Sequence, residues 1–569
     1  MTELGPAGGG PFEFEVGQRV HLGGITSTVV GRSAGAFGAV YVLETDGGRR
    51  VAFKTPRRDI VFYSGVLDRF VEETLLWMEL PLHPFVLAAR RVFKHDDRPF
   101  VEMEYVPPIN GSGSSVAALL AETPDGRPLD VMSALMIAMR LIDALAFIES
   151  FDESFIHGDV KPENLLLKVH PESAGKPFGE VALEDLMVLL SDFGMSRAAG
   201  ADFGRRLGDI NYLAPEALEP FRSSALPGPG YDWAVGSKSA DVYAVGCTIF
   251  ELLFNAPRQM LDPDTGSLVF AFDHHLDSQQ LVRIHPKLPL PLAELLAACL
   301  DPDPAQRPQT YSDLWTALVE TLERMGSETT FDPYDPEPHV RARNDPFGRY
   351  LMNRHGLSEE EAREVTYRLL RSDALQSLRE LDRAAELLDE VDRMVPGLAC
   401  VESARARSCL LLGEGERARA LLLSAIARYK ADPELMQVDS SYSVACLNLA
   451  QILSNPGWRE PDTALALAEE AVSLDPASAR VQLAHGMALM SARRFGDAAQ
   501  ALAAAESTDP ANDQIKVMHR CCQLLRAKIS PGEADDPETS EEPGLSGEDE
   551  WIATGLMKMY AADLAAEEH

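Results

Sequence analysis

A polar loop at residues 157–164, with the sequence HGDVKPEN, runs directly into an apolar segment, Leu165–Leu167. Within this loop, Asp159 can accept the proton of a hydroxyl group, and Lys161 can neutralise the charge of a phosphoryl group in transfer. Asn164 ends the loop and can bind a magnesium ion through its amide oxygen. The types and order of these residues predict phosphoryl transfer to a hydroxyl group.

A second acid stands where a metal ligand is expected. The apolar run Val188–Leu190 leads through Ser191 into Asp192, and Gly194 follows two residues later. An acid between a short apolar strand and a glycine suits a metal ligand in a cleft, whereas a single acid in a loop is usually a solvated carboxylate. Because Asp192 follows the Asp159 loop in the expected order, we favour the metal ligand.

Residues 33–40, SAGAFGAV, and Lys54 are candidate contacts for phosphate. Small residues between two strands let backbone N–H groups approach phosphate oxygens, although flexible hairpin turns have the same pattern. Lys54 ends an apolar strand, where an unpaired ammonium group is costly, and the helix after it offers Glu72 and Glu73 as partners. A lysine held in this way can bind the α- and β-phosphates of a nucleotide. The alternative is a surface lysine whose stem lies on the sheet.

Two lobes with a cleft between them would position these groups. Short β-type runs dominate residues 20–106 and are interrupted by one helical pattern at 67–80. Residues 131–325 have a mainly helical pattern, with short strands expected near 165–169 and 188–190. The sequence therefore predicts a small β-rich lobe followed by a larger helical lobe.

With these motifs in this order, residues 18–325 resemble the eukaryotic-type serine/threonine protein kinase family in its bacterial form. The resemblance rests on SAGAFGAV, VAFK, HGDVKPEN, DFG and the tripeptide Ala-Pro-Glu at 214–216. It implies a two-lobed α+β protein kinase fold that uses ATP and Mg²⁺. It also implies transfer of the γ-phosphoryl group to Ser or Thr hydroxyls of a protein substrate.

The resemblance assigns roles to individual residues. It makes Asp159 the catalytic base with Lys161 beside it, and it makes Asn164 and Asp192 the magnesium ligands. The residues that it places at the nucleotide form the glycine-rich loop, the lysine pair, the gatekeeper and the hinge: Ser33, Gly35, Phe37, Gly38, Val40, Lys54, Glu73, Met103, Glu104 and Val106.

The same resemblance predicts two structural contacts, and the sequence differs from the usual family pattern at Gly158 and Asp209. Glu216 is expected to pair with Arg307, and Asp241 is expected to brace the catalytic loop. Gly158 stands where the family usually has an arginine. Asp209 stands where serine/threonine kinases usually have a threonine, which leaves the hydroxyl specificity open.

Two other functions share parts of this pattern. Small-molecule kinases of the aminoglycoside and choline type also use His-Gly-Asp before an asparagine, but they generally lack a lysine at the position of Lys161 and lack the Ala-Pro-Glu segment. A pseudokinase would act as a scaffold or peptide-binding protein, yet here the lysine, the base and both metal ligands are present. We therefore favour an active protein kinase.

Residues 326–357 are predicted to be a linker, because the stretch FDPYDPEP is rich in Asp and Pro. The helical pattern resumes with a capping box between Ser358 and Glu361 and continues through residues 358–529. Four helix starts in this region carry an alanine at intervals of 34, 46 and 34 residues: Ala384, Ala418, Ala464 and Ala498.

This helical region resembles an all-α tetratricopeptide-like solenoid, in which small residues such as Gly486 let paired helices approach closely. The irregular second interval also fits a generic α-helical bundle. The resemblance implies that the region binds a peptide or protein ligand, for substrate docking or for regulation.

The two ends of the chain and its charge complete the prediction. Residues 1–17 are predicted to be disordered. Residues 530–569 are predicted to be an acidic tail with a short amphipathic helix, which is either a tethered ligand or an aid to solubility. The net charge of −36 argues against nucleic-acid binding.

The chain is predicted to be cytoplasmic and without a membrane span. Seven scattered cysteines form no metal or disulfide pattern, and the first residues lack a secretory signal. The most apolar segment, 131–148, contains Arg140 and Asp143, so we expect a buried helix there.

Overall fold

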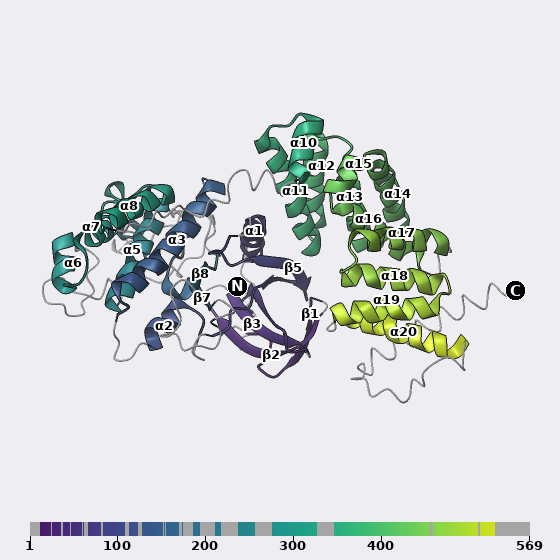
Figure 1. The fold of residues 1–569 in the computed structure, drawn as a ribbon, viewed down its shortest axis with the longest axis horizontal. Helices are drawn as coiled ribbons and strands as arrows, with labels where there is room; N and C mark the ends of the chain where they lie inside the picture. Colours follow the sequence, from purple (N-terminus) through teal and green to yellow (C-terminus); the bar gives the residue numbers. More distant parts are fainter. Residues whose placement is uncertain are drawn as a thin grey trace, which may run out of the picture.

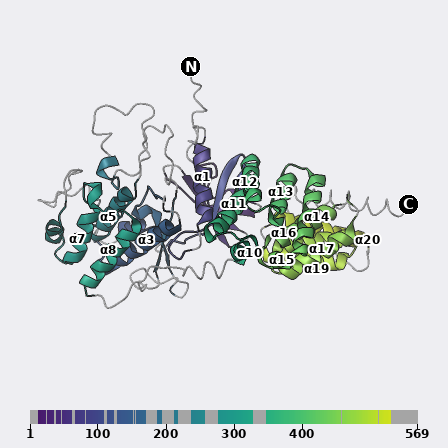
Figure 2. The same cartoon turned by 90° about the horizontal axis from the view of Figure 1, so that it is seen from above.

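The computed structural model describes residues 12–23, 25–35, 38–45, 47–59, 61, 66–80, 83–108, 113–122, 128–151, 153, 155–169, 173, 186–193, 211–217, 237–256, 276–326, 346–455, 458, 460–509 and 512–529. Figure 1 shows three parts in a row: an N-terminal lobe built on a sheet lies between a larger helical lobe and a C-terminal helical region. Figure 2 shows the same order from above.

The N-terminal lobe is a six-stranded antiparallel sheet with the strand order β1-β2-β3-β4-β6-β5. Its strands are β1 Arg19–Leu22, β2 Ile25–Ala34, β3 Gly38–Thr45, β4 Arg50–Pro56, β5 Ala89–His95 and β6 Arg98–Met103. The helix α1, Val66–Glu79, packs against β4, β5 and β6. It buries Phe70, Val71 and Leu75, as the apolar spacing of an amphipathic helix requires.

The N-terminal segment that the sequence predicts to be disordered is ordered in part. Phe14 is buried, and its ring centroid lies 5.3 Å from that of Tyr41 in β3. The backbone N–H of Gly17 donates to the carbonyl of Val29 in β2. Residues 12–17 therefore lie against the sheet in the structure, because two aromatic rings give this segment apolar surface to bury. Residues 1–11 lie outside the described residues.

The larger lobe is mainly helical and holds one small two-stranded sheet, β7-β8. Its elements are α2 Val116–Glu122, α3 Val131–Phe151, the 3-10 helix η2 Pro162–Asn164, β7 Leu165–Val169, β8 Leu186–Leu190, α5 Lys238–Phe254, α6 Ser278–Ile284, α7 Leu290–Cys299, the 3-10 helix η7 Pro304–Gln306 and α8 Tyr311–Arg324.

Among the described residues, α3 is the one helix long and apolar enough to cross a membrane. Most of its length is buried in the core of the larger lobe, where it packs against α5, α8 and β8. The buried helix predicted at 131–148 is therefore confirmed.

The C-terminal region consists of helices throughout its described residues. They are α10 Pro346–His355, α11 Glu359–Ser377, α12 Leu381–Met394, α13 Ala399–Leu411, α14 Gly415–Ala431, α15 Pro433–Val438, α16 Ser441–Leu453, α17 Pro461–Leu474, α18 Ala479–Ser491, α19 Phe495–Thr508 and α20 Asp513–Ile529. Neighbouring helices pack as the pairs α11–α12, α13–α14, α16–α17 and α18–α19.

The last third of the predicted linker, residues 326–357, contains a helix, α10. Leu351 is fully buried, and the hydroxyl of Tyr350 donates to Asp432 at 2.8 Å. These contacts attach α10 to α11 and α15. The Asp- and Pro-rich stretch at 331–338 lies outside the described residues. The predicted capping box between Ser358 and Glu361 is present at the start of α11.

The same turn recurs between paired helices. Arg379, Gly413 and Arg493 each have a positive φ, at 63°, 78° and 63°. Each stands five residues before one of the alanines at the predicted helix starts, and those alanines are fully buried. Small buried residues at these starts let each second helix lie close to the first.

The helical region and the N-terminal lobe share one hydrophobic core. The residues of α11, α12 and their connection that belong to the core of the kinase-like lobes are Ala374, Leu375, Leu378 and Ala384. Phe70 and Val71 of α1 belong to the same core, and α11 also contacts β5. At the far end of the region, Asn512 forms an isolated bridge with Ile25 of β2. The region therefore touches the N-terminal lobe at two separate places.

Candidate active site

The side chain of Lys54 on β4 joins residues from both lobes. Its Nζ contacts the carboxylate of Glu73 in α1, and it lies 2.7 Å from Oδ1 of Asp192, which follows β8. In the sheet, Lys54 pairs with Val40 on one side and Val101 on the other. Lys54 therefore starts from the middle of the sheet and connects the helix of one lobe with the predicted metal ligand of the other.

The charges in this group stabilise one another. Burial opposes the charge of Lys54, but Asp192 and Glu73 more than offset it and hold the pKa of Lys54 above its usual value. Burial raises the pKa of Glu73 even with Lys54 beside it. Burial acts in the same direction on Asp192, but Lys54 outweighs it and holds the pKa of Asp192 below its usual value. The site therefore presents a lysine cation and an aspartate anion near neutral pH.

Asp159 is oriented by its neighbours in the loop. Nζ of Lys161 lies 2.9 Å from Oδ1 and 2.7 Å from Oδ2 of Asp159. Nδ2 of Asn164 donates to Oδ2 of Asp159 at 2.9 Å and to its backbone carbonyl at 2.7 Å. Pro162 begins the turn of η2 that carries Asn164 back to this position. The arrangement places a cation beside a fixed carboxylate, as a base for phosphoryl transfer requires.

Asp241 of α5 braces the backbone of this loop, which confirms the prediction. Its carboxylate accepts hydrogen bonds from the N–H groups of His157 at 2.6 Å and Gly158 at 2.9 Å. It also accepts a bond from the hydroxyl of Tyr311 at 2.5 Å. Burial raises the pKa of Asp241, although these donors favour its charged form.

Gly158 has a φ of +78°, a conformation that side chains rarely adopt, so a glycine suits this position without strain. The contribution of Tyr311 was not predicted from the sequence. It lies 70 residues after Asp241, and no local pattern links the two.

A column of rings connects α1 to the catalytic loop. Phe193 is fully buried, and its ring centroid lies 5.6 Å from Trp77 and 5.5 Å from His157. Nε1 of Trp77 donates to the carbonyl of Leu87 at 2.6 Å. Trp77 was not among the predicted site residues, although it lies four residues after Glu73 and therefore on the same face of α1. Phe193, the neighbour of Asp192 in the chain, therefore packs between α1 and the catalytic loop.

The described residues of the glycine-rich segment belong to the paired strands β2 and β3, next to Lys54. Ser33 pairs with Val40 across β2 and β3, and the N–H of Gly35 donates to the carbonyl of Gly38 at 2.9 Å. A Cβ atom at Gly38 would lie 3.1 Å from Cε of Lys54. The absence of a side chain at Gly38 therefore makes room for the lysine stem.

The predicted hinge leaves the sheet at the end of β6. Met103 is the last residue of that strand and pairs with Ala52 of β4. Glu104 is 2.6 Å from Nζ of Lys168 in β7, and Val106 is buried. The ion pair anchors the segment between the lobes to the larger lobe.

The predicted pair of Glu216 with Arg307 is confirmed. The guanidinium donates to both carboxylate oxygens, at 2.8 and 2.9 Å. Arg307 is buried and also donates to the carbonyls of Asp301 and Ser239. A bidentate pair with its remaining donors satisfied is suited to holding the Ala-Pro-Glu segment in place. Phe37, Gly194 and Asp209 lie outside the described residues.

The oxygen donors near Asp159 fit a magnesium ion. Asn164 uses its amide nitrogen for Asp159, which leaves its amide oxygen as a ligand atom. The side chain of Asp192 is 42% exposed, and only its Oδ1 is bound to Lys54. Oxygen is the ligand that Mg²⁺ prefers, and such sites usually combine one or two protein groups with substrate phosphates. In the described part of the chain, no cluster of three or more His, Cys, Asp or Glu side chains offers another metal site.

Comparisons with known proteins find matches over about half of the chain. A family model described as the protein kinase domain matches residues 27–318. The chain is similar to the serine/threonine-protein kinase PknJ of Mycobacterium tuberculosis, with 27% identity over 312 residues, 54% of this chain and 47% of PknJ. It is also similar to PknK of the same organism, with 28% identity over 318 residues, 55% of this chain and 25% of PknK.

Among solved structures, the PknI kinase domain of Mycobacterium tuberculosis matches with a TM-score of 0.36 and 22% identity, covering 54% of this chain and 100% of that one. The chain thus spans about half the length of PknJ and about a quarter of PknK.

Proposed function

Because this chain belongs to the protein kinase family, we propose that it is an ATP-dependent serine/threonine protein kinase. The observation that carries the proposal is the contact of Lys54 with Glu73 and Asp192 at the same time. This contact joins the phosphate-binding lysine to the metal ligand, and it is found beside an oriented Asp159. PknJ and PknK are both named serine/threonine-protein kinases, which supports Ser and Thr hydroxyl groups as the phosphate acceptors.

In the proposed reaction each residue acts through a contact described above. Lys54 binds the α- and β-phosphates of ATP, and the hairpin of β2 and β3 covers them. Asp159 accepts the proton of the attacking hydroxyl group, and Lys161 stabilises the charge on the transferred γ-phosphoryl group. A magnesium ion held by Asn164 and Asp192 would neutralise phosphate charge.

A protein substrate is favoured over a small molecule. Lys161 contacts Asp159 directly, and Glu216 of the Ala-Pro-Glu segment is paired with a buried arginine. These are the two features by which the sequence differs from the small-molecule kinases that share His-Gly-Asp. The pseudokinase alternative loses support because no catalytic contact is missing among the described residues.

We further propose that residues 358–529 are a tetratricopeptide-like array that docks a peptide or protein ligand. The support is the turn that recurs at Arg379, Gly413 and Arg493, each five residues before a fully buried alanine. A close approach of Gly486 to Leu502 is also typical of paired repeat helices. We propose a cytoplasmic location, supported by seven buried cysteines with no disulfide among them.

The substitution Asp159→Asn tests the catalytic assignment. We expect transfer from ATP to a protein substrate to fall by about 10²–10⁴-fold, while nucleotide affinity changes little, because the general base is lost and the phosphate contacts remain. Transfer is measured with labelled ATP and Mg²⁺ on the full chain, followed by identification of the phosphorylated amino acid.

Asp97→Asn is the matched control, because this aspartate is fully exposed in the β5–β6 turn. Wild-type transfer by Asp159→Asn would contradict the role of the base. Transfer by the wild-type chain to a small alcohol but not to protein would favour the small-molecule alternative, and no transfer at all would favour the scaffold.

A further inference from the structure

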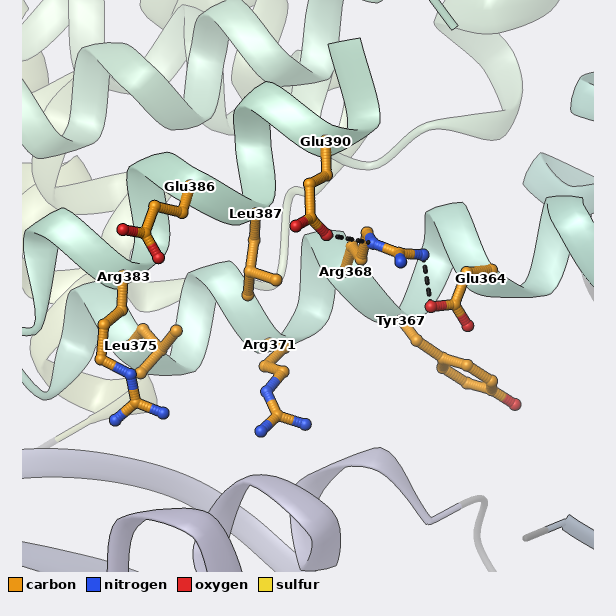
Figure 3. Close-up of a pocket in the computed structure, with 9 residues that line it drawn as sticks. All are labelled: Glu364, Tyr367, Arg368, Arg371, Leu375, Arg383, Glu386, Leu387 and Glu390. Atoms are coloured by element: carbon orange, nitrogen blue, oxygen red, sulfur yellow. Dashed lines mark hydrogen bonds and ion pairs between the residues drawn. The ribbon is translucent and has the colours of Figure 1, made fainter. Parts of the chain in front are cut away.

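Two adjacent glutamates of α1 have different partners. Glu73 contacts Lys54 in the active site, whereas Glu72 contacts the C-terminal helical region. Oε2 of Glu72 lies 2.5 Å from Nη2 of Arg371 in α11, and Oε1 contacts Arg383 in α12. Figure 3 shows Arg371 and Arg383 extending side by side from these two helices toward the N-terminal lobe.

Apolar packing surrounds these ion pairs. Leu375 of α11 and Ala384 of α12 belong to the same buried core as Phe70 and Val71 of α1. The two parts therefore meet through buried apolar side chains as well as through the ion pairs.

The ion pairs remain partly in water. The side chains of Arg371, Arg383 and Glu72 are 32%, 38% and 49% exposed. Beside them, α11 and α12 line a cavity of 440 Å³ that also contains Arg368 and Glu390. Ion pairs between partly exposed side chains are weak, so these two cannot by themselves hold domains together, but they can shift a balanced equilibrium.

The same helix also reaches the larger lobe. The ring centroid of Tyr367 in α11 lies 5.0 Å from that of Phe151 at the end of α3, in an edge-to-face contact. α11 thus contacts α1 and β5 of one lobe and α3 of the other. Contacts with both lobes allow one rigid helix to set the place of α1 relative to the larger lobe.

We propose that Arg371 and Arg383 are positioning residues for catalysis: through Glu72 they hold α1 in the rotation that keeps Glu73 on Lys54. This inference rests on the proposed kinase function. Adjacent residues on a helix point about 100° apart, so one faces the helical region while the next faces the site. Because α1 moves as a rigid body, an anchor at Glu72 constrains Glu73, and Trp77 carries the same constraint to Phe193.

The test compares full-length variants by their kinetics with ATP. In Arg371→Gln/Arg383→Gln, α1 spends more time away from Lys54, and the fraction of chains ready to bind ATP falls. We expect the KM for ATP to rise about three- to tenfold, with kcat nearly unchanged because saturating ATP restores the bound arrangement. A variant that is merely partly unfolded would instead show a lower kcat with an unchanged KM.

Arg368→Gln is the matched control. Arg368 lies on the same helix and lines the same cavity, but it pairs with Glu364 and Glu390 within the helical region. Its KM for ATP should equal that of the wild type. A rise as large as that of the double variant would overturn the proposal, because any loss of charge in the cavity would then have the same effect.

A charge exchange gives the sharper test. Glu72→Arg alone, and Arg371→Glu/Arg383→Glu alone, each place like charges together and should raise the KM for ATP. The chain that carries all three changes should recover most of the wild-type KM, since opposite charges again face each other. If the two separate changes act independently, their fold-increases in KM should multiply in the combined variant. A KM that high would overturn the proposal.

The two proposals can fail separately. If the wild-type chain transfers phosphate and the arginine variants keep its KM for ATP, the positioning role is wrong while the kinase function stands. If the wild-type chain transfers no phosphate, the affinity for an ATP analogue and hydrogen exchange in α1 still decide the positioning role. Weaker binding and faster exchange at Phe70–Trp77 in the double variant support it, and unchanged values overturn it.

Discussion

At the scale of single residues, the charged group around Lys54 illustrates why this lysine cannot be replaced without consequences. Its ammonium group separates two carboxylates that come from different lobes. Glu73 is buried with it, and Asp192 is partly exposed. Removal of the lysine therefore leaves a buried carboxylate without its cation, which costs more than the pair contributes when intact.

The substitution Lys54→Met should weaken nucleotide binding and lower the free energy of unfolding by about 3 kcal/mol at pH 8. Burial already holds the pKa of Glu73 above its usual value, and loss of Lys54 should raise it further. An unfolded glutamate ionises near pH 4.3, whereas the folded variant retains its proton, so the stability of the variant falls as pH rises above about 4.3.

This pH dependence is measured by urea unfolding at pH 5.5 and pH 8. The difference between variant and wild type should be larger at pH 8. Lys94→Met serves as the control, because Lys94 makes only a loose pair with a fully exposed Asp97. Equal losses at both pH values for Lys54→Met would show that Glu73 does not take up the proton.

At the scale of elements, the paired helices of the C-terminal region depend on how closely their backbones approach. Gly486 lies in the middle of α18, where a glycine is normally unfavourable compared with alanine. A Cβ atom at this position would lie 2.5 Å from Cγ of Leu502 in α19. Leu502 is fully buried and has little room to move. The glycine is therefore required by packing.

Gly486→Ala should lower the free energy of unfolding by about 1–2 kcal/mol, because overpacking of α19 outweighs the gain in helix propensity. Gly496→Ala is the matched control, since Gly496 lies in α19 and a Cβ atom there would meet nothing within 4 Å. The control should be as stable as the wild type or slightly more stable. Thermal unfolding of both full-length variants provides the comparison. A stabilising Gly486→Ala would contradict the close packing of α18 and α19.

At the scale of the whole molecule, the kinase lobes and the start of the helical region are not separate bodies joined by a linker. Leu375 and Leu378 are buried in the core that also holds α1 and α3. The last helices, α19 and α20, belong to a separate cluster with its own buried residues. Figure 1 shows the helical region running from α1 at one end to the strands β1 and β2 at the other. The free energy of local unfolding should therefore differ between the start and the end of the helical region.

Binding of an ATP analogue should protect part of the helical region from hydrogen exchange. At a ligand concentration 100 times the Kd, binding stabilises the folded state by about 2.7 kcal/mol. Amides that exchange only when this core unfolds should then exchange about 100-fold more slowly. We expect this slowing in α11 and α12 as well as in the kinase lobes, and a much smaller effect in α20. Exchange is followed with and without the analogue and Mg²⁺. Protection confined to residues 18–326 would show that the shared core does not unfold as one unit.

The sequence by itself determined the parts that depend on local order and spacing. The residues near Asp159, Lys54 and Asp192 occur in the order that a two-lobed kinase needs, and the apolar patterns predicted α1, α3 and β7 close to their observed bounds. The pairing of Glu216 with Arg307 also followed from motifs. Such features can be predicted because strand and helix periods and turn chemistry act over a few residues.

Only the tertiary structure decided which surfaces meet. Arg371 and Arg383 lie 299 and 311 residues from Glu72, and Tyr311 lies 70 residues from Asp241. The sequence predicts a linker at the residues of α10, but the structure has a helix there. A short helix of this kind is stable only when it is packed, here against α11 and α15. Contacts across such distances leave no periodic signal in the sequence, because they depend on how whole elements pack and on which face each element buries.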